Sequence, residues 1–250
     1  MLQKKGVTLF SSPFDNTAVD LLEDLNCPAY KIASFEIIDL PLIRYAASTG
    51  KPIIISTGMA SKVEISEAIQ TAIEAGCQQL AILLCVSGYP ASSKDYNLRT
   101  ISDMIKEFQV VVGLSDHTLS NITALSSISL GASLIEKHFT IDRKRGGPDD
   151  SFSLEPKEFK SLCIDSREAW EALGKINYGI KDTEKQNLKF RRSLYFIKNL
   201  KKGEKINEKS IKSVRPGFGI SPKYYDEIIG KRLKVNVQSQ TPVKFEYFEN

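Results

Sequence analysis

Short hydrophobic runs alternate with segments of helical spacing over the first 173 residues, and this alternation limits the fold more than any other feature of the chain. The run at 53–58 is hydrophobic on both faces, as buried parallel strands are. Alternating strands and helices are typical of a parallel barrel or a doubly wound sheet. The sequence therefore predicts an α/β fold of about six βα units. The expected strands are 7–11, 29–32, 53–58, 80–85, 110–114 and 134–138, and the expected helices are 18–25, 40–47, 61–75, 98–108, 122–130 and 156–173.

The alternation stops after Gly174, and this break predicts a second domain. Residues 174–192 are polar and show no sustained periodicity, which is typical of a linker. Residues 193–250 alternate short strand-like runs with turn residues, so they predict a small, mostly β module. A module of this size gains stability by docking onto a larger surface. The predicted organisation is thus a barrel-like domain at 1–173, a linker at 174–192 and a β module at 193–250.

The two histidines of the chain both follow hydrophobic strands. His117 ends the run that begins at Val110, and His138 ends the run that begins at Leu134. The carboxyl ends of parallel strands share one face, which is where barrel enzymes hold their active sites. A converging histidine pair flanked by Asp116 and Glu136 is a plausible divalent-metal site. Two unrelated polar residues that end strands would give the same pattern, and the histidines alone do not decide between these interpretations.

Hydroxyls and a lysine lie at the ends of the other predicted strands. Hydroxyl groups beside an ammonium group suit a bound phosphate. Together with the imidazoles, they suggest a phosphorylated small substrate beside a divalent cation. Part of the set is equally explained as Ser and Thr caps of the following helices. The strand-end residues are Ser11, Ser12, Lys31, Ser34, Ser56, Thr57, Ser87, Tyr89, Ser115 and Glu136.

Composition narrows the classes of partner. The formal charge is +4, and residues 181–215 alone carry twelve Lys or Arg against four Asp or Glu, a net of +8. Because no nucleic-acid motif accompanies this stretch, we interpret it as a basic surface near an anionic substrate rather than a nucleic-acid site. No apolar run approaches the roughly 20 residues of a membrane span, and the N-terminus lacks a secretion signal. Four cysteines without CxxC spacing favour a reduced, cytoplasmic protein.

Nine motifs, in order along the chain, resemble those of the sialic acid synthase family. The resemblance implies a (β/α)₈ barrel followed by a small antifreeze-like (SAF) β-clip domain. It also implies an enzyme that condenses phosphoenolpyruvate with an N-acyl amino sugar. Family members begin with two further βα units, so this chain starts at what resembles their third strand. The motifs are Ser12-Pro-Phe-Asp, Tyr30-Lys-Ile-Ala-Ser, Pro52-Ile-Ile-Ile-Ser-Thr-Gly-Met, Gly113-Leu-Ser-Asp-His-Thr, Glu136-Lys-His-Phe-Thr, Gly147-Pro-Asp, Ser153-Leu-Glu-Pro, Arg192-Ser and Arg215-Pro-Gly.

The resemblance also assigns roles to individual residues. It makes His117 and His138 the ligands of a divalent cation, Mn²⁺ in the first place and Mg²⁺ or Co²⁺ as alternatives. It also implies that Glu136 lies beside this cation and transfers a proton. The residues that resemble the phosphoenolpyruvate-binding set are Lys31, Ser34, Ser56 and Ser115, and those that resemble sugar-contacting positions are Tyr89, Asp149 and Arg215. Ser87 belongs to the substrate-binding set as well, although many relatives carry Asn there.

Substrate and assembly follow from the same resemblance. The loop at 146–154 and the motif at 215–220 are more similar to pseudaminic acid synthases than to N-acetylneuraminate synthases. The expected assembly is a homodimer in which the SAF-like module of each subunit carries Arg215 into the other subunit's site. The alternatives are an N-acetylneuraminate synthase, an inactive fragment that acts as a binding or assembly module, and an aldolase or another barrel synthase that uses phosphoenolpyruvate. Neither a nucleic acid nor a membrane is an expected partner.

Overall fold

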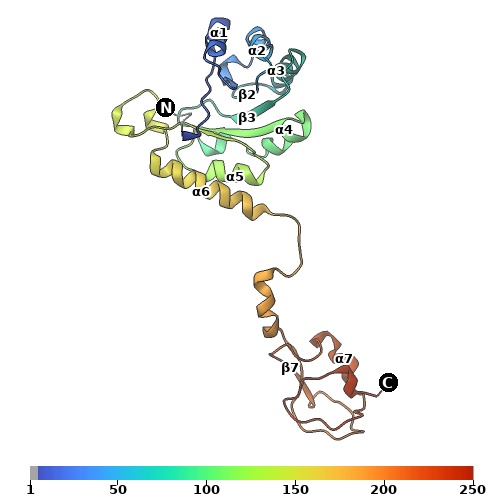
Figure 1. Cartoon of the computed structure of the whole chain (residues 1–250). Coiled ribbons are helices and arrows are strands. Elements are labelled where there is room, and N and C mark those ends of the chain that lie inside the picture. Colours follow the sequence, from blue (N-terminus) through green and yellow to red (C-terminus); the bar gives the residue numbers. More distant parts are fainter. Residues whose placement is uncertain (1–4, 250) are drawn as a thin grey trace. The chain divides into compact units, whose positions relative to one another are not determined.

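Five of the hydrophobic runs form one parallel sheet in the order β1-β2-β3-β4-β5 in the computed structural model, which describes residues 5–249 (Figure 1). Neighbouring strands are also neighbours in sequence, and every pairing is parallel. All carboxyl ends therefore lie at the same edge of the sheet, as the βα alternation predicts. The strands are β1 (Tyr30–Ile32), β2 (Ile53–Ser56), β3 (Leu80–Cys85), β4 (Val111–Asp116) and β5 (Ile135–Lys137).

Helices return the chain between these strands. In Figure 1, α1, α2 and α3 stand side by side, and α5 packs against α6. Side chains cap their first turns: Asp39 accepts the amide of Leu42, and Ser61 forms a capping box with Glu64. Within residues 5–249, no helix has the length and hydrophobicity needed to cross a bilayer. The helices are α1 (Asn16–Asp24), α2 (Leu40–Ala47), α3 (Lys62–Glu74), α4 (Thr100–Phe108), α5 (Ile122–Ser129) and α6 (Pro156–Leu173).

The core of this unit lies between the sheet and its helices. Ile53 and Ile55 of β2 are fully buried, and so are Ile82 of β3 and Leu114 of β4. Small residues of the helices, such as Ala46, complete the cluster. Burial of these side chains fixes the position of each strand in the core. The polar residues at the end of each strand are thereby held at one edge of the sheet.

The prediction of a sixth strand at 7–11 is wrong. Ser11 alone forms a bridge with Tyr30 of β1, and the preceding residues have no strand structure. Val7 and Leu9 are 48% and 60% exposed, so this apolar run covers no core. Alternation of residue types shows that a run can form a strand, but the strand forms only where a partner and a core are present. Among residues 5–175, the first unit therefore has five βα-type strands rather than about six.

The second unit is a small β structure with its own core. The two units differ in their internal contacts, and the boundary between them lies between Lys175 and Ile176. Its antiparallel strands β6 (Ser193–Phe196) and β7 (Ile211–Val214) enclose a hydrophobic cluster with the short helix α7 (Tyr225–Ile228). The predicted linker contains a 3-10 helix, η6 (Asp182–Phe190), whose first turn is capped by Glu184. The shorter 3-10 helices are η2 (Ser34–Glu36), η3 (Ser93–Asp95), η4 (Arg143–Arg145), η5 (Asp150–Phe152), η7 (Pro222–Tyr224) and η8 (Phe245–Tyr247).

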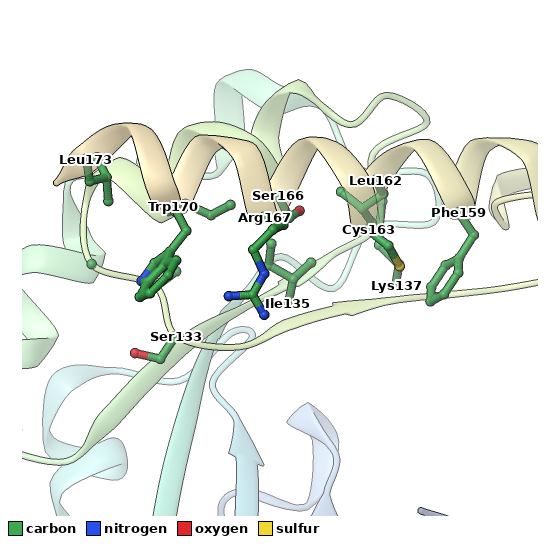
Figure 2. A pocket seen from close by; sticks show the side chains of 13 residues that line it. Ser133, Ile135, Lys137, Phe159, Leu162, Cys163, Ser166, Arg167, Trp170 and Leu173 are labelled. Atoms are coloured by element: carbon green, nitrogen blue, oxygen red, sulfur yellow. The ribbon is translucent and has the colours of Figure 1, made fainter. Parts of the chain in front are cut away.

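A groove of about 570 Å³ lies between β5 and α6 (Figure 2). Ile135 and Lys137 of β5 face it, together with Phe159 and Trp170 of α6. In the described part of the chain β5 pairs only with β4, so the groove runs along an edge of the sheet. Successive side chains of a strand point to opposite faces. Glu136 of β5 therefore faces away from this groove, which is separate from the polar strand ends.

Candidate active site

The structure brings the two histidines together. His117 directly follows β4, and His138 directly follows β5, and these strands are neighbours in the sheet. The centroids of the two imidazole rings lie 5.1 Å apart. His117 is buried with 5% of its surface exposed. The parallel pairing of the strands thus produces the convergence that the order of elements in the sequence suggests.

Each imidazole is held through the same ring nitrogen. Nδ1 of His117 lies 2.8 Å from the carbonyl oxygen of Val86, and Nδ1 of His138 lies 3.3 Å from Oδ2 of Asp149. A carbonyl can only accept, so the neutral His117 ring donates from Nδ1 and keeps a lone pair on Nε2. Histidines that bind metals are typically oriented in this way by an oxygen partner behind the ring.

These residues fit a divalent cation that takes two imidazole nitrogens from the protein. Within residues 5–249, no cluster of three His, Cys, Asp or Glu side chains with metal-binding geometry occurs. Burial lowers the pKa of His138, and the neighbouring His117 lowers it further against the pull of Asp149. A neutral imidazole is the form that binds metal, so this shift favours binding at His138. Burial also lowers the pKa of His117, but hydrogen bonds with Cys85 and with the Val86 carbonyl outweigh it and raise this pKa.

A second cluster surrounds the lysine of β1. Nζ of Lys31 donates to Oγ of Ser56 at 2.5 Å and lies 3.6 Å from Oε1 of Glu136. The same carboxylate oxygen accepts the hydroxyl of Ser115 at 2.7 Å. Four strands of the sheet contribute one residue each to this chain of contacts. Burial lowers the pKa of Lys31, although Glu136 opposes the shift. The cluster presents one ammonium group and two hydroxyls at the strand ends, which suits an anionic ligand.

Ser34 and Ser87 meet over a glycine next to this cluster. The backbone amide of Gly58 donates to Oγ of Ser34 at 3.1 Å. A β-carbon on Gly58 would lie 2.2 Å from Oγ of Ser87 and 2.8 Å from Oγ of Ser34, so a side chain there would displace both hydroxyls. Oγ of Ser87 is buried and has no hydrogen-bond partner within the described residues. A buried hydroxyl without a partner is one that a bound ligand can satisfy.

Aromatic side chains form the wall beside the histidines. The ring of Tyr89 lies 4.4 Å from that of His117 and 5.3 Å from that of Phe152. The ring of Phe152 also lies 5.0 Å from that of His138. With Asp149 bound to His138, the loop after β5 supplies both a carboxylate and an apolar surface. The predicted sugar-contacting residues of the first unit thus gather at the histidine pair.

Arg215 belongs to the second unit. It follows β7, and its side chain is exposed. Phe218, three residues later, is 64% exposed.

The expectation that Asp116 flanks the metal is wrong. Its carboxylate forms a buried ion pair with Lys137, in which Nζ and Oδ2 are 3.0 Å apart. Asp116 and His117 are consecutive, so their side chains leave the strand end on opposite sides. The ion pair instead joins the last residue of β4 to the last residue of β5.

Sequence reasoning missed two contributors to the site. Gly58 was seen only as the end of a hydrophobic run, although its bare α-carbon accommodates two serine hydroxyls. Cys85 has no CxxC partner in the sequence, but its thiol lies among polar groups at the end of β3. Burial raises the pKa of this thiol, and hydrogen bonds with His117 and Ser34 outweigh the burial and lower it. Neither role has a local sequence pattern, because both depend on residues from other strands.

Comparison with known families assigns both parts of the chain. The NeuB family model matches residues 1–178, and the SAF domain model matches residues 191–249. The chain belongs to the NeuB family. Pseudaminic acid synthase of Helicobacter pylori is 41% identical over 251 residues, which covers 100% of this chain and 74% of that protein. N,N'-diacetyllegionaminic acid synthase of Campylobacter jejuni is 40% identical over 245 residues, with 97% and 73% covered.

A solved structure of a relative has the same fold. The crystal structure of the spore coat polysaccharide biosynthesis protein SpsE from Bacillus subtilis superposes with a TM-score of 0.67 at 31% identity. The match covers 100% of this chain and 75% of SpsE. The five-stranded sheet of this NeuB-family chain is thus one part of a TIM-type barrel, and the SAF domain follows it. The predicted fold class and the predicted family are both confirmed.

Proposed function

We propose that this NeuB-family chain is a nonulosonic acid synthase, a transferase that joins phosphoenolpyruvate to an N-acyl amino sugar with formation of a C–C bond. The observation that carries the proposal is that Glu136 connects the Lys31 cluster to the histidine pair. Its carboxylate contacts Lys31, and it precedes His138 by two residues, so both side chains leave β5 on the same side and their charges interact. An anion site thus adjoins a metal site. The similarity to pseudaminic and legionaminic acid synthases supports the same reaction class.

In this proposal the Lys31 cluster binds phosphoenolpyruvate. The Lys31 ammonium group and the Ser56 hydroxyl face its phosphate and carboxylate, and the unpaired hydroxyl of Ser87 gains a partner. Ser34 stays fixed by the Gly58 amide. Two charged groups on one small substrate hold its reactive C3 atom in one orientation, and orientation contributes much of the rate in such reactions.

His117 and His138 would hold the divalent cation through Nε2, and we propose Mn²⁺, with Mg²⁺ and Co²⁺ as alternatives. When bound, such a cation polarises the aldehyde oxygen of the open-chain sugar as a Lewis acid. C3 of phosphoenolpyruvate attacks the aldehyde carbon, and water adds at C2. The Glu136 carboxylate, which accepts the Ser115 hydroxyl, would accept the proton of that water. Loss of phosphate from C2 then completes the reaction.

The aromatic wall favours a sugar with apolar substituents. Phe152 and Tyr89 face the histidines, so a methyl group of a 6-deoxy sugar would be buried there, whereas a hydroxyl would lose hydrogen bonds to water. We therefore propose the pseudaminic acid precursor class, a 2,4-diacetamido-6-deoxy sugar. As the resemblance implies, Arg215 would bind its N-acyl group across a homodimer.

A substrate panel tests this choice. With phosphoenolpyruvate and Mn²⁺ fixed, the 2,4-diacetamido-6-deoxy sugar should give product, and N-acetylmannosamine should be turned over far more slowly. Replacement of Phe152 by Leu, which keeps an apolar side chain, should preserve this ranking. Turnover of N-acetylmannosamine together with inactivity on the 6-deoxy sugar would show that the chain is an N-acetylneuraminate synthase instead.

A further inference from the structure

The backbone hydrogen bonds between β3 and β4 end before they reach His117. The last registered pair is Cys85 with Ser115. Beyond it the chain leaves β3 in a loop, so the backbone groups of β4 that face β3 need other partners. Two of these groups are the carbonyl of Ser115 and the amide of His117, which point to the same side of the strand because they are two residues apart.

The hydroxyl of Tyr96 occupies the missing position of the ladder. It donates to the Ser115 carbonyl at 3.0 Å and accepts the His117 amide at 2.7 Å. Tyr96 lies in the loop between η3 and α4, and 1% of its surface is exposed. Its ring is part of the hydrophobic core of the unit. The side chain therefore reaches the strand end from a rigid position, and no water competes for its hydroxyl.

This contact completes the fixation of His117. Its amide is bound to Tyr96, its carbonyl accepts the amide of Ala91 at 3.1 Å, and its Nδ1 atom lies 2.8 Å from the Val86 carbonyl. Nε2 is then the one polar atom of the residue that none of these three contacts occupies. Three points of attachment determine both the position of the backbone and the orientation of the ring.

We propose that Tyr96 is a positioning residue, whose hydroxyl fixes the end of β4 so that His117 presents Nε2 and Ser115 presents its hydroxyl to the candidate active site. The consequence for catalysis rests on the proposed function. The geometry of His117 does not, and it can be measured in the metal-free chain. Tyr96→Phe removes the hydroxyl and keeps the buried ring, so it isolates the hydrogen bonds from the packing.

Nuclear magnetic resonance of the imidazoles tests the proposal directly, since the chain has two histidines. In the metal-free wild-type chain, at a pH where the rings are neutral, His117 should be a single tautomer with its proton on Nδ1. In Tyr96→Phe, the ¹⁵N shifts of His117 should move toward a mixture of the two tautomers. A folded Tyr96→Phe chain with an unchanged His117 tautomer would overturn the proposal.

Metal affinity provides a second measurement, with a matched control. Tyr96→Phe should weaken Mn²⁺ binding by about 10- to 100-fold, as the loss of an outer partner of a metal ligand does. Tyr30→Phe removes another buried tyrosine hydroxyl of the same unit, one that binds Glu23, and should leave Mn²⁺ binding unchanged. Equal weakening of Mn²⁺ binding in both variants would show that Tyr96 has only a structural role. Because the tautomer is read without metal, an error in the metal assignment is distinguishable from an error in the positioning role.

Hydrogen exchange of the wild-type chain tests the proposal even if Tyr96→Phe fails to fold. His117 follows the last residue of β4, yet its amide should exchange as slowly as that of Leu114 in the middle of the strand, because a buried hydroxyl holds it. An amide of His117 that exchanges as fast as those of the exposed loop residues would contradict the contact on which the proposal stands.

Discussion

Replacement of His117 by Ala is expected to lower the kcat/KM of the condensation by more than about 100-fold, since loss of a mere outer partner of a metal ligand already costs about 10- to 100-fold. His138→Ala should have an effect of the same size, because each imidazole would supply one of the two protein ligands. Steady-state kinetics at saturating Mn²⁺ measures the loss. His138→Ala should change the melting temperature little, since His138 lies beyond the end of β5 and is partly exposed, whereas His117→Ala removes a buried ring and should lower it.

The same variants contain their own control. The Lys31 cluster makes no hydrogen bond to either histidine ring within the described residues, so His117→Ala should still bind phosphoenolpyruvate with nearly wild-type affinity. Chelation of the metal from the wild-type chain should reproduce the loss of turnover, and added Mn²⁺ should restore it. Substantial turnover by His117→Ala in the presence of a chelator would show that the histidines do not hold a catalytic metal.

Replacement of Lys31 by Met should weaken the apparent affinity for phosphoenolpyruvate by about 10- to 150-fold. A hydrogen bond to a charged group contributes about 1.5 to 3 kcal/mol, and 1.4 kcal/mol corresponds to about tenfold in affinity. Methionine keeps much of the buried side-chain volume and removes the ammonium group. Titration with phosphoenolpyruvate in the absence of sugar measures the effect without turnover.

Lys51 provides a matched control for Lys31. It is a partly buried lysine of the same unit that pairs with Glu23 at 2.6 Å, away from the strand ends. Lys51→Met should reduce stability and leave phosphoenolpyruvate affinity unchanged. An unaltered affinity in Lys31→Met, or an equal loss in Lys51→Met, would exclude Lys31 as the phosphate-binding residue.

The affinity for phosphoenolpyruvate should also depend on pH through Lys31. Burial lowers the pKa of this lysine below its ordinary value of 10.5, with Glu136 opposing the shift. Binding of an anion favours the protonated ammonium group, so the affinity is full below this pKa and declines as the pH rises through it. Lys31→Met has no proton to lose and should lack this decline.

The periodicity of the sequence was sufficient for most elements of the first unit. Helices α2 and α6 begin and end as predicted, because the capping residue Asp39 and the proline at position 156 mark their starts. The strand expected at 7–11 failed, since a strand also requires a neighbour. No local pattern of residues reports whether that neighbour is present.

The candidate site was predictable only in part, for a related reason. The parallel order of the elements predicts that residues at the strand ends lie at one edge of the sheet. His117, His138 and Lys31 do lie at that edge. Asp116 does not flank the histidines as expected, because a strand directs consecutive side chains to opposite sides. The hydroxyl of Tyr96 reaches the end of β4 from a distant loop, and such a contact exists only after the chain has folded.

Release of inorganic phosphate from phosphoenolpyruvate tests the central proposal most directly. The purified chain should release phosphate when Mn²⁺ and the 2,4-diacetamido-6-deoxy sugar are both present, with one nine-carbon acid formed for each phosphate. Omission of either the sugar or the metal should stop the release. Phosphate release that is independent of the sugar, or its absence while phosphoenolpyruvate and Mn²⁺ both bind, would contradict the assignment of this chain as a nonulosonic acid synthase.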